Sequence, residues 1–415
     1  MRIAIIGGGV SGLVSALLLG EEHDVTVFEA NDYIGGHTHT IDVTQPDGNY
    51  AVDTGFIVFN HENYPNFVRL LKRLNVGAQP SSMSFGVMNR ATGLEYGFST
   101  WDAVFAQRRN LVSPSFLRML LEIRRFRGEF KRLIRDLDDS VEMGDYLRQN
   151  GYSEMFLRDF LVPFGAAIWS APPSEFMHFP LRTFVQFFMN HGFLDLSRLL
   201  QWHVVKGGSR SYVTALLGQL RATVHVKSPV VAVRRDAEGV DVVVNGCEVQ
   251  RFEQVVLACH SDQALRMLAD ASSEEREVLG GLPYQPNDVV LHTDQRLMPS
   301  HRKVWSSWNY CVSDGDEPRA TLTYDMNILQ GLKSSKEFLV TLNPDRAMAD
   351  GAEIGRFVYD HPVYRVDGVA AQSRHAEISG INRRTHFAGA YWGFGFHEDG
   401  VESALRVCSA FNKSL

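Results

Sequence analysis

The stretch that decides the fold is Arg2-Ile3-Ala4-Ile5-Ile6-Gly7-Gly8-Gly9-Val10-Ser11-Gly12, followed by an apolar run over 13–19 and a β-type run over 24–29. An apolar strand, a GxGxxG sequence, a helix and a second strand make a βαβ unit. Gly7 permits the tight turn, Gly9 lets the backbone approach a diphosphate, and Gly12 lets the helix pack on the strand. The diphosphate of a dinucleotide would lie at the helix N-terminus, where free N–H groups favour negative charge.

Two further features strengthen this interpretation. Glu29 ends the second strand, seventeen residues after Gly12, where its carboxylate could accept hydrogen bonds from an adenosine ribose. Ile34-Gly35-Gly36 follows and extends the fingerprint in the way typical of FAD-binding two-domain oxidases. The alternative is a membrane span over 3–20, but the glycines and serines of this stretch are unlike a lipid-facing helix of about 20 residues.

Composition sets bounds on the protein class. A chain of 415 residues can form two domains, and 45% hydrophobic with 21% charged residues is ordinary for a soluble globular protein. The net charge of −7 argues against nucleic-acid binding. The four cysteines form no CxxC pair, which predicts no metal site and a reducing compartment. We expect no signal peptide, and therefore a cytoplasmic location, because the first strand begins at residue 2.

The sequence predicts an α/β fold with a Rossmann-like FAD-binding domain and a second, substrate-binding domain of antiparallel sheet plus helices. The FAD-binding domain is expected over 1–75, 205–285 and 380–415, and the substrate-binding domain over 76–204 and 286–379. Hydrophobic periodicity predicts helices over 64–74, 115–137, 212–221 and 400–411. It predicts strands over 41–43, 50–52, 83–89, 94–97, 224–226, 230–234, 239–244, 255–258, 289–293, 304–310, 320–325, 338–342 and 386–389.

The predicted helix over 115–137 is strongly basic, in contrast to the acidic chain as a whole. Its cations are Arg118, Arg124, Arg125, Arg127, Lys131, Arg132 and Arg135, against Glu122 and Glu129. A solvated helix face is one interpretation. The other is a docking surface for anionic lipid headgroups, to which each cation contributes about 1 kcal/mol.

The segment over 156–202 is rich in aromatic residues and poor in acids. It contains Phe160, Phe164, Trp169, Phe176, Phe179, Phe184, Phe187, Phe188, Phe193 and Trp202, with Asp159, Glu175 and Asp195 as its acids. A hydrophobic core explains most of these residues. An apolar substrate passage through a helical domain would explain the rest.

With these motifs in hand, the chain resembles the flavin amine oxidase superfamily. The resemblance is greatest to a branch of bacterial FAD-binding proteins associated with cyclopropane-fatty-acyl-phospholipid synthase, and fused to that synthase in plants. The motifs that carry it are YIGGHTHT (33–40), DTGFIVFN (53–60), YPNF (64–67), SMSFGV (82–87), IWSAPP (168–173), WSSWNY (305–310), LVTLNPD (339–345) and GAYWGFGFHEDGVESA (389–404).

The resemblance implies which residues hold the cofactor. The diphosphate loop would be Gly7, Gly9, Val10, Ser11 and Gly12, with Glu29 and Ala30 at the ribose and Val230 at the adenine. A second phosphate turn would comprise Gly35, Gly36, His37 and Thr38, with Gly55 and Phe56 beside it and with Gly389, Gly400 and Val401 at the pyrophosphate and isoalloxazine. Many members carry Arg where this chain has His37. The closing loop over 398–400 lacks the cysteine of covalent-flavin members, so the expected cofactor is non-covalent FAD.

The same resemblance implies hydride transfer from a substrate C–H bond to the flavin, with dioxygen as a reoxidant. His397 is the first candidate for an acid/base group because its unperturbed pKa lies near neutrality. Glu398, Tyr391 and Tyr324 are further catalytic candidates, whereas Asp399 fits a helix N-cap. Tyr391, Trp392, Phe394 and Phe396 could wall the flavin ring.

Four functions remain open at this point. The first is FAD-dependent desaturation of a long-chain fatty acyl group of a membrane lipid, which could be methylated or cyclopropanated. The others are a strict amine oxidase, a flavin-dependent lipid isomerase, and a non-catalytic flavin-holding partner of a lipid methyltransferase. The expected partners are therefore a fatty acyl lipid, an anionic membrane surface at the inner face of the membrane and a lipid methyltransferase, with no nucleic acid and no metal.

Overall fold

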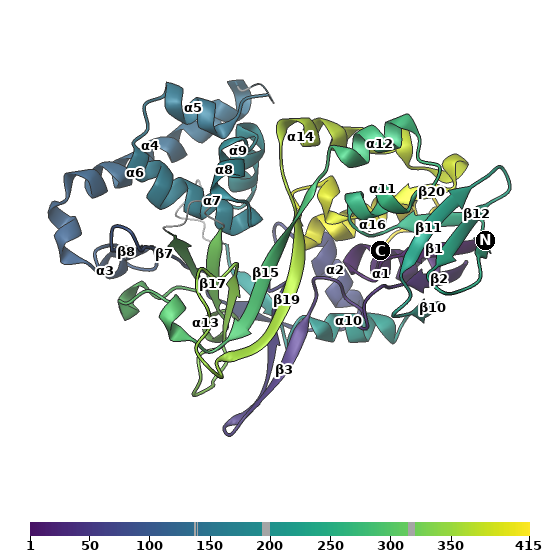
Figure 1. Cartoon of the computed structure of the whole chain (residues 1–415), viewed down its shortest axis with the longest axis horizontal. Helices are drawn as coiled ribbons and strands as arrows, with labels where there is room; N and C mark the ends of the chain where they lie inside the picture. The colour runs from purple at the N-terminus through teal and green to yellow at the C-terminus, as the bar shows by residue number, and fades with distance from the viewer. Residues whose placement is uncertain (137, 139, 193–199, 314–319) are drawn as a thin grey trace.

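The computed structural model describes residues 1–136, 138, 140–192, 200–313 and 320–415. Figure 1 shows a parallel sheet with its helices at one side, a group of helices at the other, and a large twisted sheet between them. Among the described residues, no helix is long and apolar enough to cross a membrane.

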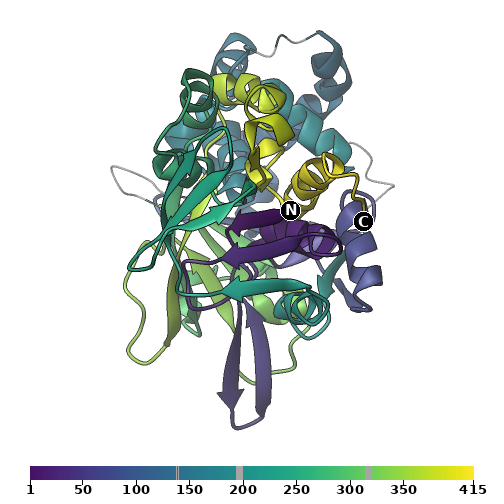
Figure 2. The same ribbon diagram turned by 90° about the vertical axis from the view of Figure 1, so that its right-hand side faces the viewer.

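The parallel sheet contains the βαβ unit that the glycine motif predicts. Its strand order is β10-β2-β1-β14-β20, comprising β10 (Ala222–His225), β2 (Asp24–Phe28), β1 (Arg2–Ile6), β14 (Gln254–Leu257) and β20 (Thr385–Phe387). Helix α1 (Val10–Leu19) connects β1 to β2, and nine of its ten residues are buried. Strands far apart in the chain therefore meet in a single Rossmann-like sheet (Figure 2).

A three-stranded antiparallel sheet and two helices lie beside the parallel sheet. The strands are β11 (Val230–Arg235), β12 (Val240–Val244) and β13 (Gln250–Phe252). Their inward valines pack with α11 (Ser261–Met267) and α12 (Ser273–Gly280) in one core cluster. The strands predicted over 230–234 and 239–244 therefore form a hairpin, because β11 and β12 pair in antiparallel fashion.

The central seven-stranded sheet has the order β19-β15-β18-β17-β16-β7-β8. Its strands are β19 (Glu353–Pro362), β15 (Tyr284–His292), β18 (Leu339–Leu342), β17 (Thr321–Asp325), β16 (Trp308–Val312), β7 (Phe85–Asn89) and β8 (Leu94–Gly97). The expected sheet was antiparallel throughout, but β16 runs parallel to β7, with Trp308 opposite Phe85. This pairing joins two distant chain segments, which no hairpin signal in the sequence reveals.

Two strand predictions in this sheet need correction. The strand expected over 304–310 begins only at Trp308, because Arg302–Val304 forms a 3₁₀ turn. Strand β19 was not predicted at all. It is an edge strand with charged residues, a glycine and few buried side chains, and it forms because β15 offers an unpaired edge along its whole length.

Two smaller sheets connect these layers. The strands predicted over 41–43 and 50–52 are longer in the structure, where β3 (Thr40–Gln45) and β4 (Gly48–Asp53) pair as a hairpin. The second small sheet, absent from the prediction, comprises β5 (Val58–Asn60), β9 (Trp202–Val205) and β6 (Ala78–Ser81). It joins the chain before and after the helical region, because β9 pairs with both β5 and β6.

The helical region follows β8. It comprises α3 (Trp101–Val104), η1 (Arg108–Val112), α4 (Pro114–Asp136), α5 (Met143–Gln149), α6 (Glu154–Phe156), a π-helical turn η2 (Leu157–Leu161), α7 (Val162–Trp169), α8 (Pro173–Met177) and α9 (Leu181–Asn190). Helix α4 begins one residue before the predicted start, and residue 137 lies outside the described residues. Most aromatic residues of the region share one hydrophobic core, as the composition suggested.

The remaining helices lie mostly around the parallel sheet. They are α2 (Pro65–Arg73), α10 (Arg210–Leu217), η3 (Gln295–Leu297), η4 (Arg302–Val304), α13 (Met326–Gln330), α14 (Val366–Ser373), α15 (His375–Ile378), η5 (Ile381–Arg383), η6 (Ala390–Trp392) and α16 (His397–Ser409). Helix α10 ends at Leu217, before Gly218, and not at 221. Helix α16 begins at His397 and not at Gly400, so the predicted loop acids form its first turn.

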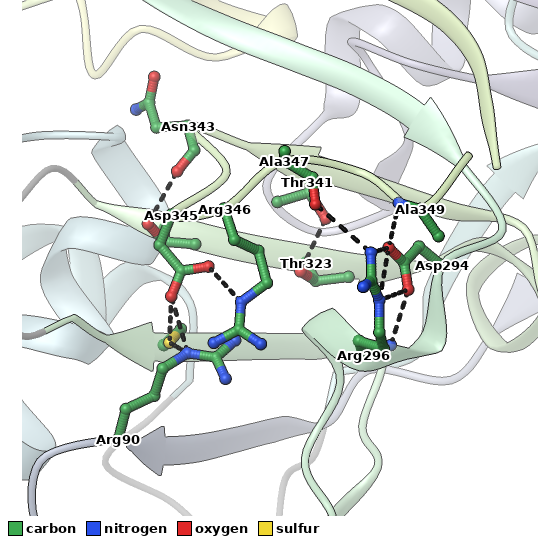
Figure 3. A network of polar contacts seen from close by, with 12 residues as sticks. Arg90, Asp294, Arg296, Thr323, Thr341, Asn343, Asp345, Arg346, Ala347 and Ala349 are labelled. Atoms are coloured by element: carbon green, nitrogen blue, oxygen red, sulfur yellow. Dashed lines mark hydrogen bonds and ion pairs between the residues drawn. The ribbon is translucent and has the colours of Figure 1, made fainter. Parts of the chain in front are cut away.

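A polar network fastens the turns of the seven-stranded sheet at the end shown in Figure 3. Arg90 donates to Asp345 over 2.7 Å, and Arg296 donates to Asp294 over 2.6 Å. The Thr323 and Thr341 hydroxyls are hydrogen-bonded across the adjacent strands at 2.8 Å. None of these residues lines the cavity described below, so the network serves the scaffold.

Candidate active site

One cavity of about 1320 Å³ extends from the glycine loops into the helical region. Near the parallel sheet its wall contains the loops after β1 and β2. At the other end it is lined by aromatic side chains of the helical region, including Phe160, Phe164, Trp169, Phe187 and Phe188. We call the first part the nucleotide arm and the second part the aromatic arm. The glycine loops, which are of the dinucleotide-binding type, and the apolar chamber therefore border the same continuous cavity.

The glycine loop of the nucleotide arm is shaped by backbone contacts. Gly7 has a φ of 110°, and a Cβ on Gly12 would lie 2.0 Å from the Gly7 carbonyl oxygen. A Cβ on Gly9 would meet no protein atom within 4 Å, although Gly9 lines the cavity. The space at Gly9 is therefore open for a ligand, and the first-turn amides of α1, which have no side-chain cap, border it.

The second glycine pair packs directly on the first. The Gly35 amide donates to the Gly8 carbonyl over 2.9 Å, and a Cβ on Gly36 would lie 3.1 Å from Gly9 Cα. Gly36 has a φ of 59°. Two loops that are separate in sequence thus form one concave surface of backbone, as a diphosphate-binding site requires.

Glu29 lies at the rim of this surface and is almost fully buried. One carboxylate oxygen accepts the Gly8 amide over 2.7 Å and the other accepts the Asn31 amide over 2.9 Å. These bonds fix the carboxylate at the end of β2 and leave further lone pairs for a ribose hydroxyl.

The other predicted cofactor residues divide into two groups. Those that line the cavity are Gly7, Gly9, Val10, Ser11, Glu29, Ala30, Gly35, Gly36, His37, Gly55, Phe56, Val230 and Gly389. Gly12, Thr38, Gly400 and Val401 lie behind the wall. Gly400 nevertheless shapes it, because its carbonyl accepts the Ser11 hydroxyl over 2.8 Å and joins α16 to α1.

His397 lies in the wall as a hydrogen-bonded neutral group. Its Nε2 is 2.6 Å from the Tyr212 hydroxyl and 3.4 Å from Thr38 Oγ1, and its ring stacks on Phe56 at 3.7 Å. Burial, reinforced by nearby His37, lowers the pKa of His397 to about 3. The imidazole is thus uncharged at neutral pH and holds the wall in place, a geometry that favours a positioning role over the predicted acid/base role.

Glu398 and Tyr391 face away from the cavity. Glu398 accepts the backbone amides of Asn66 and Phe67, each over 2.9 Å, and so caps α2. Tyr391 is buried in the core beside Trp392, and neither lines the cavity. The predicted aromatic wall is therefore made by Phe394 and Phe396 and not by the Tyr391–Trp392 pair.

Tyr324 does line the cavity, where it is in edge-to-face contact with Trp308 at 5.3 Å. Both come from neighbouring strands β16 and β17. Asp325 points elsewhere, because it caps α13 by accepting the Ile328 amide. Asp399 is not the N-cap that the sequence suggested: Phe396 occupies that position, and Asp399, at the third position of α16, accepts the Phe396 amide over 2.8 Å.

His37 belongs to a partly buried group of histidines at the nucleotide arm. Its ring lies 5.9 Å from His260 and 5.5 Å from His361, and its Nε2 is 3.1 Å from the Asp360 carbonyl oxygen. Burial lowers the pKa of all three, to about 3 for His260 and His361. Within the described ranges, no group of three or more His, Cys, Asp or Glu side chains could hold a metal ion. Because their pKa values are lowered, these three imidazoles are neutral at neutral pH, and His37 supplies no positive charge to the cavity wall.

The fit to a flavin dinucleotide rests on this geometry. The open space at Gly9, the paired glycine loops and the fixed carboxylate of Glu29 suit a diphosphate and a ribose. The sequence motifs predicted the glycines and the carboxylate of the nucleotide arm. They did not find Tyr212 or Trp308, whose positions depend on tertiary packing and carry no local signal.

Comparison with known proteins identifies the class. The profile described as flavin containing amine oxidoreductase matches residues 10–328, so the chain belongs to that family. It is a flavin-dependent oxidoreductase with the FAD-binding fold of this family.

Individual relatives match less of the chain. A probable zeta-carotene desaturase of Synechococcus elongatus is 26% identical over 189 residues, which cover 40% of this chain and 38% of that protein. Flavin-containing amine oxidase A of Canis lupus familiaris is 35% identical over 97 residues, 23% of this chain and 18% of that protein. The chain thus aligns with well under half of either relative.

Solved structures match over the whole length. Cyclohexylamine oxidase from Brevibacterium oxydans has a TM-score of 0.70 at 16% identity, covering 99% of this chain and 98% of that one. A fatty acid isomerase from P. acnes that produces CLA has a TM-score of 0.70 at 14% identity, with the same coverage. At these identities the likeness shows the fold and leaves the substrate open.

Proposed function

We propose that this oxidoreductase uses non-covalently bound FAD to oxidise the acyl chain of a long-chain lipid, in a desaturation or a related reaction. The observation that carries the proposal is the aromatic arm. It is continuous with the nucleotide arm, and among the described residues that line it there is no carboxylate. A fatty chain needs such an apolar passage, whereas an amine needs a partner for its nitrogen.

The acids predicted near this arm support the proposal. Asp159 is completely buried, but it is paired with Arg158 at 2.7 Å and does not line the cavity. Glu175 is paired with Arg365 at 2.9 Å outside it. Asp195 lies outside the described residues. The two acids that do line the cavity, Glu29 and Asp360, belong to the nucleotide arm.

The binding energy available from the aromatic arm is large. Burying acyl chain contributes about 0.8 kcal/mol per methylene, so ten methylenes contribute roughly 8 kcal/mol before ordering costs. A lipid could therefore be held without charge pairing along its chain. Phe394 and Phe396, from the loop before α16, line the cavity in ring contact with Phe187 of the aromatic arm and would exclude water from the reacting carbon.

The residues of this chain would hold and orient the cofactor. The diphosphate would bind to the amides at the α1 N-terminus, and Glu29 would accept ribose hydroxyls. Bound flavin supplies the hydride acceptor. His397, neutral and bonded to Tyr212, keeps its place without titrating near neutral pH.

The test uses purified protein, which should be yellow and should release FAD on heating. Oleic acid and other long-chain acyl lipids should perturb the flavin absorbance under anaerobic conditions, whereas putrescine should not. If polyamines reduce the flavin quickly and lipids never do, the protein is an amine oxidase. A product with a moved double bond and no consumption of oxidant would instead indicate a lipid isomerase.

We also propose that the protein docks on the cytoplasmic face of an anionic membrane. Of the cations on α4, Arg118 and Arg125 are paired with Glu122 and Glu129, and Arg124, Lys131 and Arg135 are exposed. Exposed apolar side chains lie on α3, on η1 and in the first turns of α4, and Figure 1 shows α3 and α4 at the same side of the molecule. They are Trp101 (77% exposed), Leu111, Val112 (80%), Leu117 and Leu121 (66%). An apolar patch beside cations suits an anionic lipid surface.

A methyltransferase that modifies lipid acyl chains is the protein partner we propose. The support is the sequence resemblance to proteins associated with cyclopropane-fatty-acyl-phospholipid synthase. Pull-down of such a synthase by the tagged protein would support the pairing. Fatty-acid profiles that are identical in cells with and without the gene would contradict a role in acyl modification.

A further inference from the structure

Arg127 occupies an unusual position for a helix cation, because it lines the cavity. Ile123, Phe126 and Phe130 of α4 line it too, at spacings of three and four residues that place all four side chains on one helix face. The sequence alone groups Arg127 with the solvated cations of α4. The structure places it beside apolar side chains of the aromatic arm. Figure 1 shows α4 on the opposite side of the molecule from α1, the helix that the glycine loop precedes.

The guanidinium of Arg127 has no partner among the described residues. Its Nε is buried without a hydrogen bond. The other cation that lines the cavity, Arg266, is paired with Asp262 at 2.7 Å. On α4 itself, Arg118 and Arg125 each have a glutamate partner one turn away. Arg127 therefore differs from Arg266, because no acid among the described residues is paired with its charge.

An unpaired, half-buried guanidinium is unfavourable for the folded protein. Burial with no nearby acid lowers the pKa of Arg127, which reflects the cost of removing the charge from water. Scaffold packing would be served better by an apolar residue of similar length. The residue makes physical sense if an anion from outside the protein supplies the missing partner.

We propose that Arg127 binds the carboxylate of a free long-chain fatty acid whose chain lies in the aromatic arm. The planar guanidinium presents paired N–H donors that match the two carboxylate oxygens. In a free acid the carboxylate is joined directly to the chain, so the chain begins among Ile123, Phe126 and Phe130. In a phospholipid, glycerol and a second chain separate the phosphate from the reacting chain. The inference rests on the proposed function and names its substrate class.

The experiment measures equilibrium binding of four probes to the flavin-loaded protein by calorimetry. The probes are palmitate, methyl palmitate, hexadecylamine and dipalmitoyl phosphatidylglycerol. Wild type should bind palmitate at least tenfold more tightly than the methyl ester or the amine. Arg127→Met should remove this preference and leave methyl ester binding unchanged, and Arg127→Lys should restore part of it. Arg124→Met, on the exposed face of the same helix, is the matched control and should behave like wild type.

Thermal stability separates this role from a structural one. Arg127→Met should unfold at the same temperature as wild type or a higher one without lipid, because it removes an unbalanced charge. A clear loss of stability, or equal palmitate binding by wild type and Arg127→Met, would overturn the proposal. Arg127-dependent binding of phosphatidylglycerol in place of palmitate would also overturn it, in favour of a phospholipid. If palmitate binds through Arg127 but never affects the flavin, the anchor stands and the proposed oxidation fails.

Discussion

The two arms of the cavity are built in opposite ways. The nucleotide arm is made of backbone: Gly12 packs on Gly7 and Gly36 packs on Gly9, a hydrogen bond joins the two loops, and amides fix one carboxylate. The aromatic arm is made of side chains from several helices, which also form the hydrophobic core. A backbone site binds a constant cofactor and tolerates almost no change, whereas a side-chain site can be reshaped one residue at a time. Substrate choice is therefore expected to reside in the aromatic arm.

Substituting glycines of the first loop should give the largest effects, and it should separate the loss of flavin binding from the loss of folding stability. Gly12→Ala would place a Cβ 2.0 Å from the Gly7 carbonyl, so the backbone must move at a cost of at least about 1–3 kcal/mol. Gly9→Ala meets no protein atom within 4 Å and should change stability by less than about 0.5 kcal/mol. Both variants should lose flavin, but only Gly12→Ala should also lose stability in chemical denaturation. Full flavin content in Gly9→Ala would contradict the cofactor placement.

Glu29→Lys should strip the cofactor from a protein that still folds. The substitution removes the acceptor of the Gly8 and Asn31 amides and places a cation where a ribose acceptor is needed. Flavin affinity should fall by at least about 100-fold, because a charged hydrogen-bond partner is lost and lysine cannot accept. Absorbance at the flavin band after reconstitution measures this, with Asp32→Lys on the neighbouring loop as the control.

The contrast also explains what the sequence could predict. The nucleotide arm follows from local motifs, since Gly7, Gly9, Gly12 and Glu29 lie in one βαβ unit whose geometry is common to many proteins. The role of Arg127 depends on which face of α4 turns inward, and that is set by packing against α6 and α9. The start of α16 was misplaced because Glu398 and Asp399 resemble loop residues, yet their carboxylates accept backbone amides from α2 and from the N-cap. The domain boundaries drawn from the sequence stay a prediction.

Phe187→Ala and Phe176→Ala should separate lipid binding from core packing in the aromatic region. Both phenylalanines are buried, but Phe187 lines the cavity and Phe176 does not. Each substitution should cost about 3–5 kcal/mol of unfolding free energy. Only Phe187→Ala should also weaken palmitate binding, and both should keep wild-type flavin content. Equal palmitate affinity in the two variants would mean that Phe187 belongs to the core alone.

A smaller effect should appear in the pH dependence of stability. His397 has an ordinary pKa near 6.5 when unfolded and a pKa of about 3 in the folded protein, so the unfolded state binds the extra proton as pH falls. Stability is thus fully present above pH 6.5 and is lost progressively below it, by about 2 kcal/mol between pH 7 and pH 5 from this group alone. His397→Asn should flatten the slope of unfolding free energy against pH over this range. An unchanged slope would show that His397 is not buried as a neutral group.

The smallest effects are expected at the surface of the helical region, where membrane docking would take place. Arg124 and Lys131 are exposed and unpaired among the described residues, and each should contribute about 1 kcal/mol to binding of anionic vesicles. Replacing both with Gln should weaken binding at low salt, and the difference from wild type should shrink as the Debye length falls from about 10 Å at 0.1 M to about 3 Å at 1 M.

Two further double variants serve as controls. Arg118→Gln combined with Arg125→Gln should weaken binding less, because both arginines already have glutamate partners. Trp101→Ser with Val112→Ser should weaken binding at every salt concentration, since apolar burial is not screened. All three double variants should keep the wild-type flavin spectrum, because these side chains lie far from the glycine loops. If wild type binds neutral and anionic vesicles equally, the cations do not contribute to docking and only the apolar side chains could.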